Sequence, residues 1–295
     1  MRLLLLGGNG QVGRELRRSL AALGELVVAT RGGGAGDAAA DFDAPESLVG
    51  LIARIAPDVV VNAAAHTAVD QAEQDRDAAF RVNAEAPAVL ARACAARGAL
   101  LLHYSTDYVF DGNATRPYRE DDPTAPLGVY GESKLAGEVA IRDSGARHAI
   151  LRTAWVYAAH GRNFLRTMLR LASERDELRV VADQVGAPTP ASWIADATAA
   201  MLRRGIDDAG TWHVVADGET SWHGFASAIM REAVAAGLLA RAPSVLPIGT
   251  ADYPTPARRP AYSVLDTARL RRDFGLQPPG WEAGLRATLR EFASA

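Results

Sequence analysis

The sequence predicts an α/β protein with a doubly wound parallel sheet and a smaller region after it. Short, nearly continuous apolar runs, typical of buried parallel strands, alternate with segments whose apolar residues recur at helical spacing. A glycine-rich turn comes directly after the first apolar run. This alternation indicates βαβ units, in which helices cover both faces of a parallel sheet.

The first half of the chain contains most of the expected strands. Residues 2–6 form the first apolar run, and residues 12–23 follow with the spacing of an amphipathic helix. Four further apolar runs predict strands at 26–30, 58–61, 100–104 and 149–152. Helical spacing predicts two longer helices, at 78–96 and 130–142.

The pattern changes after Thr153. Helices are expected at 162–173, 194–204 and 285–292, with one strand at 212–215 and frequent prolines from 243 to 260. We therefore expect residues 1–152 to form the sheet domain and residues 153–295 to form mainly the second region. Later segments are expected to return to the first domain.

Composition limits the classes of function. Of the 295 residues, 48% are hydrophobic and 23% are charged, as in ordinary soluble globular proteins. The net charge of −3 gives no reason to expect a nucleic-acid partner or an anionic membrane surface, and no apolar run approaches a membrane span. The chain shows no signal peptide and a single cysteine, so we expect a cytoplasmic protein without an internal disulfide.

Gly7, Gly10 and Gly13 follow a strand and open a helix, as in the dinucleotide-binding loop of Rossmann-like domains. Such glycines allow a tight turn and a close approach of the backbone to a pyrophosphate, which the free N–H groups of the helix N-terminus bind. The alternative is a strand-to-helix turn without a ligand. We predict that residues 1–152 bind a dinucleotide through these glycines and that residues 153–295 mainly bind substrate.

The end of the second strand bears on cofactor choice. NAD-selective sites place a carboxylate there for the adenosine ribose, whereas this strand ends in Thr30-Arg31. Arg31 can pair with a 2′-phosphate, so we predict NADPH as the preferred cofactor, with NADH as the alternative. Asp41 and Phe42 are candidates to cradle the adenine, and a surface helix cap is the competing interpretation.

Lys134 is the only lysine among the 32 lysine and arginine residues. A compact ammonium and a planar guanidinium are not interchangeable, so a retained lysine points to a specific need. Lys134 follows Tyr130 by four positions, which places both on one helix face. A nearby cation lowers the pKa of a phenol, so we expect Tyr130 to exchange protons near neutral pH. The same spacing also occurs by chance in many helices.

Four longer motifs accompany the glycine loop and the Tyr130/Lys134 pair. They are NAAAHTAVD at 62–70, HYSTDYVF at 103–110, RTAWVY at 152–157 and DQVGAPT at 183–189. With these motifs taken together, the chain resembles the extended short-chain dehydrogenase/reductase superfamily and, within it, the dTDP-4-dehydrorhamnose reductase family. The resemblance runs from Met1 to about Phe292.

The resemblance implies an oxidoreductase of dTDP-rhamnose biosynthesis, which reduces the C4 carbonyl of dTDP-4-dehydro-β-L-rhamnose with NADPH. Tyr130 would protonate the alkoxide, Lys134 would bind the nicotinamide ribose, and Thr106 would hydrogen-bond the carbonyl oxygen. Asp107 and Trp155 would contact the sugar. The implied cofactor contacts are Gly10, Gln11 and Val12 at the pyrophosphate, and Ala65, His66 and Thr67 along its central part.

Several of these residues have competing interpretations. His66 and His103 are more typical of structural histidines at strand ends, and Trp155 of a core residue. Arg258 and Arg259 are candidates for the dTDP phosphates or for a solvated loop.

Some relatives bind magnesium at a dimer contact. Glu15 suits that role, but residues 191–193 lack the acidic partner, so we expect no metal site and a monomer or a homodimer.

Three other functions fit parts of the same sequence pattern. A nucleotide-sugar 4,6-dehydratase or epimerase is disfavoured because a dehydratase needs a glutamate after the aspartate, where this chain has Tyr108. A reductase that forms another 6-deoxy epimer stays open, since the face of hydride attack depends on how the sugar lies. A non-catalytic regulatory subunit is disfavoured because Thr106, Tyr130 and Lys134 are all present.

Overall fold

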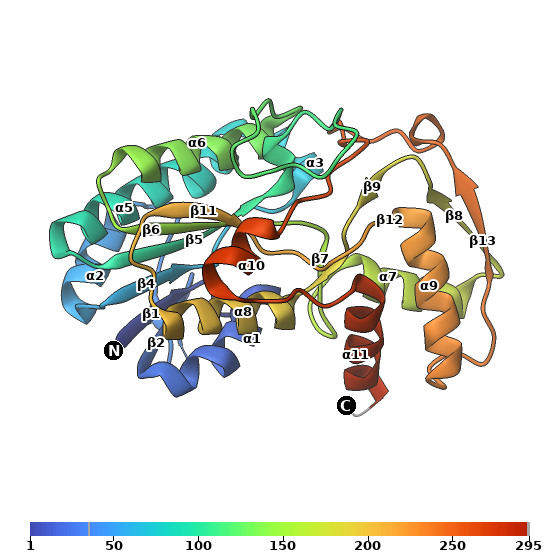
Figure 1. Ribbon diagram of the computed structural model, residues 1–295, viewed down its shortest axis with the longest axis horizontal. Helices are drawn as coiled ribbons and strands as arrows, with labels where there is room; N and C mark the ends of the chain where they lie inside the picture. The colour runs from blue at the N-terminus through green and yellow to red at the C-terminus, as the bar shows by residue number, and fades with distance from the viewer. Residues whose placement is uncertain (35, 294–295) are drawn as a thin grey trace.

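The computed structural model describes residues 1–34 and 36–293, and it confirms the predicted fold class (Figure 1). A seven-stranded parallel sheet has the order β11-β6-β5-β4-β1-β2-β3. Its strands are β1 (Arg2–Leu6), β2 (Glu25–Thr30), β3 (Ala38–Ala39), β4 (Val59–Asn62), β5 (Leu100–Thr106), β6 (His148–Thr153) and β11 (Gly210–His213).

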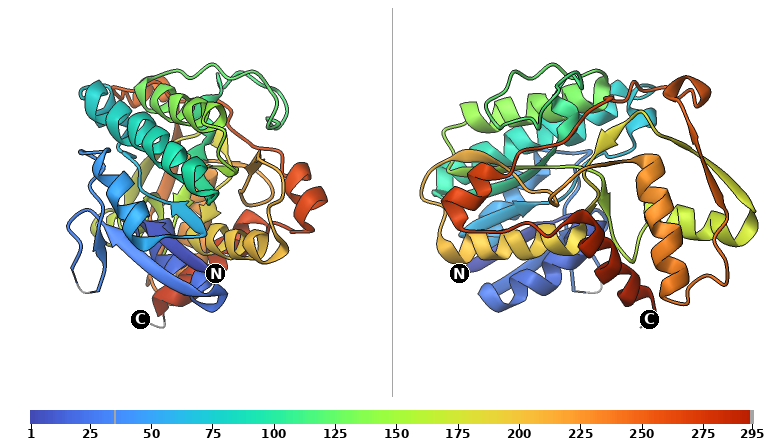
Figure 2. Two further views of the ribbon diagram at one scale, coloured as in Figure 1. Left: turned by 90° about the vertical axis from the view of Figure 1, so that its left-hand side faces the viewer. Right: turned by 45° about the vertical axis from the view of Figure 1, so that its right-hand side comes forward.

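Helices cover both faces of this sheet because successive strand residues point to opposite sides. Leu3 and Leu5 pack under α1 (Gln11–Leu20), α8 (Ala191–Arg204) and α10 (Ala268–Phe274). Leu4 and Leu6 pack under α2 (Ser47–Ile55), α5 (Ala86–Arg97) and α6 (Val129–Asp143). The two further views show α1 and α8 side by side on their face (Figure 2). The strands are therefore buried on both faces, as their continuous apolar runs predict.

The helix expected at 78–96 is interrupted in the structure. It consists of α4 (Arg76–Phe80), a π-helical turn (Arg81–Glu85) and α5. Pro87 has no N–H to donate to the carbonyl of Asn83 four residues earlier, which favours a departure from α-helical pairing. That carbonyl packs instead against Gly137, where a Cβ atom would lie 2.2 Å from it.

The second part of the molecule surrounds its own apolar core. It contains α7 (Phe164–Glu174), α9 (Trp222–Ala235), α11 (Trp281–Ala293) and the parallel pair β8 (Glu177–Val181) and β13 (Ser244–Ile248). Short pairs join β7 (Val156–Tyr157) to β10 (Thr189–Pro190), and β9 (Val185–Gly186) to β12 (Thr220–Ser221). The remaining short helices are α3 (Val69–Ala72) and 3-10 turns at Ala21–Leu23, Asp107–Val109 and Thr250–Asp252.

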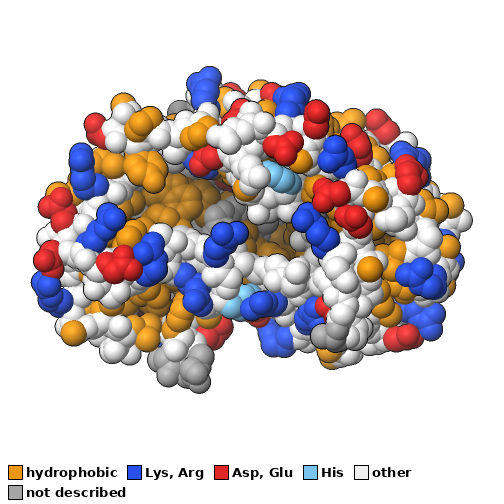
Figure 3. Space-filling view, turned by 180° about the vertical axis from the view of Figure 1, so that it is seen from behind, with side chains coloured by type: hydrophobic (Ala, Val, Ile, Leu, Met, Phe, Trp, Pro, Cys, Tyr) orange, Lys and Arg blue, Asp and Glu red, His pale blue; other side chains and the backbone are white. Residues whose placement is uncertain are grey.

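The chain crosses between the two parts more than once. β11, α8 and α10 come from beyond residue 153 but complete the sheet domain. Seen from the side opposite to Figure 1, the surface is hollowed, and both basic and acidic side chains lie around the hollow (Figure 3). Within the described ranges, no helix is long and apolar enough to cross a membrane.

Candidate active site

A cavity of about 480 Å³ lies where the carboxyl ends of β1, β4, β5 and β6 meet. Parallel strands end at one edge of a sheet, so residues from distant motifs converge there. We call it the strand-end cavity. Its lining includes these residues proposed from the sequence: Gly10, Gln11, Val12, Ala65, Thr67, Thr106, Asp107, Tyr130, Lys134 and Trp155. The other lining residues are Ala63, Val69, Tyr104, Ser105, Tyr108, Thr153, Ala154, Val156, Arg162, Asn163, Trp222 and Arg259.

The three glycines of the loop have different structural roles. Gly7 has φ +78°, and a Cβ atom there would lie 2.6 Å from the Ala64 nitrogen. A Cβ atom on Gly13 would lie 2.1 Å from the Gly7 oxygen. Gly10 has more room, since its nearest neighbour would be that oxygen at 3.4 Å. Gly7 and Gly13 thus shape the turn behind the cavity. Gly10, which has no side chain, leaves the backbone N–H groups at the uncapped N-terminus of α1 uncovered.

The residues predicted to select the cofactor lie outside the strand-end cavity. Arg31 is exposed, and its Nη2 lies 3.4 Å from Asp43 Oδ2. The Asp41 carboxylate accepts a hydrogen bond of 3.0 Å from the Asp43 nitrogen. Phe42 is only 5% exposed and packs in the core beside α2. Its ring therefore belongs to the core, which leaves its backbone as the part available to an adenine.

Tyr130 and Lys134 project from the first turns of α6 toward the cavity. Gly131 lets this helix approach the turn at Asp107–Val109, because a Cβ atom there would lie 2.2 Å from the Tyr108 oxygen. Lys134 is 2% exposed, and its Nζ donates to the Tyr104 carbonyl at 2.7 Å. A hydrogen bond joins the side chains of Tyr130 and Thr106.

Burial determines the acidity of this pair. It raises the pKa of Tyr130, against the smaller opposing effect of the Thr106 hydrogen bond. It lowers the pKa of Lys134 to about 8, while the charge of Glu138 acts in the opposite direction. The expectation that Lys134 brings the tyrosine pKa toward neutrality is therefore wrong for this structure. Burial is the largest influence on the phenol, Lys134 is not among the groups that shift its pKa, and the phenol stays protonated at neutral pH.

Asp107 lies beside this pair and is buried. Burial raises the pKa of its carboxyl group to about 6, and the hydrogen bond from Thr106 opposes that shift. Thr106 Oγ1 donates to Asp107 Oδ1 at 2.9 Å and accepts from the Tyr108 nitrogen at 3.2 Å. The Thr106 hydroxyl thus links the carboxyl group to the phenol.

Asn83, which the sequence analysis did not identify, fixes the loop after β4. Its Oδ1 accepts from the His66 nitrogen at 2.9 Å, and its Nδ2 donates to the His66 oxygen at 3.0 Å. Nδ2 also lies 3.1 Å from Ser133 Oγ on α6. The π-helical turn that carries Asn83 therefore ties the loop that contains Ala65 and Thr67 to the helix of Tyr130. His66 is held through its backbone and does not line the cavity.

Trp155 has an unusual backbone and a stacked side chain. Its φ is +47°, which is rare for a residue other than glycine. Its ring stacks on that of Trp222 from α9, with centroids 3.5 Å apart and planes at 2°. Gly186 leaves space for the indole, since a Cβ atom there would lie 2.4 Å from it. Trp222 is a second aromatic residue of the cavity that the sequence analysis missed.

Arg259 connects the strand-end cavity to a second pocket. Its Nη2 lies 2.7 Å from Asp70 Oδ2, and its Nη1 donates to the Tyr108 hydroxyl at 3.2 Å. Arg258 beside it is exposed and lines neither space. Of the two arginines proposed from the sequence, only Arg259 is therefore placed at the site.

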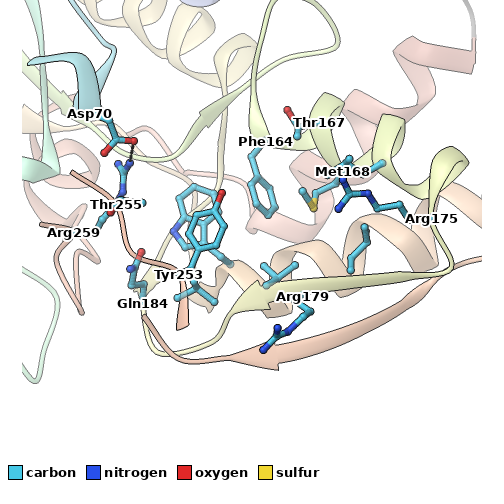
Figure 4. Close-up of a pocket in the computed structure, with 15 residues that line it drawn as sticks. Asp70, Phe164, Thr167, Met168, Arg175, Arg179, Gln184, Tyr253, Thr255 and Arg259 are labelled. Atoms are coloured by element: carbon cyan, nitrogen blue, oxygen red, sulfur yellow. Dashed lines mark hydrogen bonds and ion pairs between the residues drawn. The ribbon is translucent and has the colours of Figure 1, made fainter. Parts of the chain in front are cut away.

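The second pocket, which we call the apolar pocket, has a volume of about 440 Å³. Figure 4 shows Asp70 and Arg259 at one end and Arg175 at the other, with Tyr253 and Phe164 between them. The full lining is Asp70, Phe164, Thr167, Met168, Leu171, Arg175, Leu178, Arg179, Val180, Val181, Gln184, Trp222, Tyr253, Thr255 and Arg259. Trp222 and Arg259 border both spaces, so one elongated ligand can reach both.

Glu15, the candidate magnesium ligand, is bound to protein groups. Its Oε1 lies 2.8 Å from His160 Nε2, and its Oε2 lies 3.6 Å from Arg18 Nε. Among the residues that the structure describes, no three His, Cys, Asp or Glu side chains are grouped so that they could hold a metal ion.

Comparison with known proteins gives a consistent set of relatives. The RmlD substrate binding domain family model matches residues 1–294. A dTDP-4-dehydrorhamnose reductase of Burkholderia thailandensis is 50% identical, and the match covers 100% of this chain and 100% of the relative. The dTDP-4-dehydrorhamnose reductase of Escherichia coli strain K12 is 47% identical, with 99% of this chain and 98% of the relative covered.

Solved structures agree with these relatives. A dTDP-4-dehydrorhamnose reductase from Clostridium acetobutylicum has a TM-score of 0.91 at 36% identity and covers 99% of both chains. A dTDP-4-dehydrorhamnose reductase from Bacillus anthracis, in complex with NADP, has a TM-score of 0.88 at 35% identity. The match with the second structure covers 98% of this chain and 99% of the other.

Proposed function

This chain belongs to the RmlD substrate-binding-domain family of dTDP-4-dehydrorhamnose reductases, and we propose that it makes dTDP-L-rhamnose. The reaction is the NADPH-dependent reduction of the C4 carbonyl of dTDP-4-dehydro-β-L-rhamnose. One observation carries the proposal. Thr106, Tyr130 and the buried Lys134 line the same cavity as the glycine loop.

The residues at the strand-end cavity fit a nicotinamide dinucleotide. Gly10 presents a bare surface at an uncapped helix N-terminus, which suits a pyrophosphate. Gln11 and Val12 would complete that contact, and Ala65 and Thr67 would lie along the central part of the cofactor. When bound, the cofactor supplies the hydride.

The preference for NADPH rests on the end of β2. Thr30 offers no carboxylate to a ribose 2′-hydroxyl. The exposed Arg31 guanidinium lies 3.4 Å from the Asp43 carboxylate and can turn to a 2′-phosphate.

Tyr130 is the proton donor in the proposed mechanism. Because burial raises the pKa of its phenol, Tyr130 keeps its proton until an alkoxide forms at C4 of the sugar. The proton then moves from the phenol oxygen to the sugar oxygen. Thr106 turns its hydroxyl toward the same oxygen and stabilises the developing charge. Lys134, which lines the same cavity, would hold the ribose of the bound cofactor.

The nucleotide part of the substrate is assigned to the apolar pocket. Phe164, Met168 and Tyr253 offer apolar surface to a thymine base. Arg259 lies between the two spaces, where the diphosphate must pass if the sugar reaches Tyr130. A guanidinium binds phosphate oxygens through charge-assisted hydrogen bonds. The Trp155–Trp222 stack then forms the wall beside the sugar.

The test is to mix the purified protein with NADPH and freshly made dTDP-4-dehydro-β-L-rhamnose. Loss of the reduced cofactor is followed by absorbance, and the sugar product is identified by NMR. We expect dTDP-L-rhamnose. Another 6-deoxy epimer would keep the mechanism and change the product. No turnover in a protein that binds NADPH would reject the proposal and favour a regulatory subunit.

A further inference from the structure

His103 is a fully buried residue of β5 to which the proposed reaction assigns no role. Its two ring nitrogens face two polar side chains. Nδ1 lies 3.0 Å from Asn62 Nδ2, and Nε2 lies 3.2 Å from Lys134 Nζ. Asn62 is the partner of His103 in the register between β4 and β5, so the contact is built into the sheet.

Asn62 determines which nitrogen of the imidazole carries the proton. Its Oδ1 accepts a hydrogen bond of 3.1 Å from the Ala64 nitrogen, so its Nδ2 is the group that donates to His103 Nδ1. Burial, together with the charge of Lys134, lowers the pKa of His103 well below its ordinary value, and the ring is neutral. A neutral imidazole has one N–H. Because Nδ1 accepts, Nε2 carries the hydrogen and directs it at Lys134.

The other charged groups around Lys134 do not cancel this effect. Glu138, one turn further along α6, is held by Arg152 Nε and Nη2 at 2.9 and 2.7 Å and by Arg142 at 3.1 Å. Its carboxylate is therefore largely neutralised. Tyr130 and Asp107 line the cavity side, and Tyr104 accepts through its carbonyl. The lysine thus has one carbonyl acceptor and one N–H directed at its nitrogen.

We propose that His103, oriented by Asn62, is a positioning residue that favours the neutral amine of Lys134 and so limits the pH range in which this residue is an ammonium at the strand-end cavity. The inference rests on the proposed function. When an N–H bond of the ammonium breaks and the proton passes to solvent, the remaining amine accepts the hydrogen bond from His103 Nε2. His103 itself neither gains nor loses a proton.

The single lysine makes a direct measurement available. Protein labelled with ¹³C at the lysine Cε gives one side-chain NMR signal, whose pH titration reports Lys134 in the folded, unliganded chain. The wild-type midpoint is expected near 8, below the roughly 10.4 of an ordinary lysine. His103→Gln places an amide near the position of Nε2, and the amide oxygen can accept from the ammonium. The midpoint should rise by about one unit, a tenfold gain in proton affinity.

His213→Gln is the matched control. His213 is also fully buried, but its Nδ1 faces the Asp266 carbonyl at 3.0 Å. This variant should leave the lysine midpoint unchanged. An unshifted midpoint in folded His103→Gln, or an equal shift in both variants, would overturn the proposal.

Asn62→Ser tests the same idea if His103→Gln does not fold. Without the amide that donates to Nδ1, the imidazole is free to present a lone pair to the ammonium, and the midpoint should again rise. An unchanged midpoint would reject the role of Asn62 and with it the assigned tautomer. The titration needs no substrate, so it tests the role of His103 separately from the enzyme assay. Absence of turnover in the wild type would reject the proposed function, and the titration would still test the role of His103.

Discussion

The two walls of the strand-end cavity differ in how deeply their side chains are buried. On the sheet side, Lys134 and Thr106 are buried and hydrogen-bonded to the ends of strands. On the other side, Trp222 and Arg259 are half-buried, and Tyr253 in the adjoining pocket is 60% exposed. The first wall is closed off by the protein itself, whereas the second keeps side-chain surface exposed that a substrate can contact. Changes in the first should therefore alter kcat, and changes in the second should alter KM.

Tyr130→Phe should have the largest effect of the single changes. It removes the hydroxyl that donates the proton and retains the ring, so kcat should fall roughly a thousandfold, within the range for general acid catalysis. NADPH binding, measured by fluorescence titration, should stay within about threefold, because the phenol contributes little to cofactor binding. A variant that keeps a tenth of the wild-type kcat would show that another group protonates the sugar.

Lys134→Arg should lower kcat by roughly a hundredfold although it preserves the positive charge. The guanidinium is larger than the ammonium in a site that is 2% exposed, and it cannot give up a proton at these pH values. Lys134→Met serves as the comparison because it retains the length of the side chain without the charge. If Lys134→Arg is much more active than Lys134→Met, charge alone explains the role of this lysine.

Turnover in the direction of reduction should fall above a pH of about 8, by about tenfold for each further unit. The ammonium of Lys134 is lost in this range, whereas Tyr130 keeps its proton because burial raises its pKa. A pH–rate profile that stays flat well above this value would contradict the assignment.

The same lysine should make the free energy of unfolding depend on pH. The unfolded chain holds the lysine proton up to about pH 10.4, but the folded chain only up to about 8. The unfolded state therefore binds more protons between these values, and the contribution of Lys134 to stability should increase as the pH rises through them. Urea unfolding of the wild type and Lys134→Met across this range measures the difference.

Arg259→Gln should raise the KM for the nucleotide sugar by about tenfold and leave kcat within about twofold. It removes the charge assigned to the diphosphate, at a position that borders both spaces. Arg258→Gln is the matched control, since that neighbour is exposed and lines neither space. Equal effects of the two changes would mean that the loop as a whole, and not the Arg259 contact, attracts the substrate.

Arg31→Ala should have the smallest effect, because this residue lies outside both walls. The KM for NADPH should rise about fivefold while the KM for NADH stays unchanged, since only NADPH has a 2′-phosphate to contact an exposed arginine. Steady-state kinetics with each cofactor measure the ratio. An equal rise in the KM for both cofactors would show that Arg31 does not select between them.

The sequence predicted the sheet-side wall better than the opposite one. The strands of the main sheet are continuous apolar runs, and their motifs meet because parallel strands end together. β8 was missed because it is not a continuous apolar run like the strands of the main sheet; it alternates around Arg179, as a strand buried on one face does. Trp222 and Asn83 act through contacts with residues far along the chain, which local patterns do not indicate. The direction of the Tyr130 pKa shift also depends on burial, which spacing alone does not give.

The kinetic constants of Thr106→Val and Trp222→Leu, measured side by side, test the difference between the walls most directly. Thr106→Val keeps the shape of the side chain and removes its hydroxyl, so kcat should fall by about a hundredfold with KM within about twofold. Trp222→Leu removes the stack on Trp155, so KM should rise by about fivefold with kcat within about twofold. If Trp222→Leu lowers kcat as much as Thr106→Val does, the two walls do not divide catalysis from substrate binding.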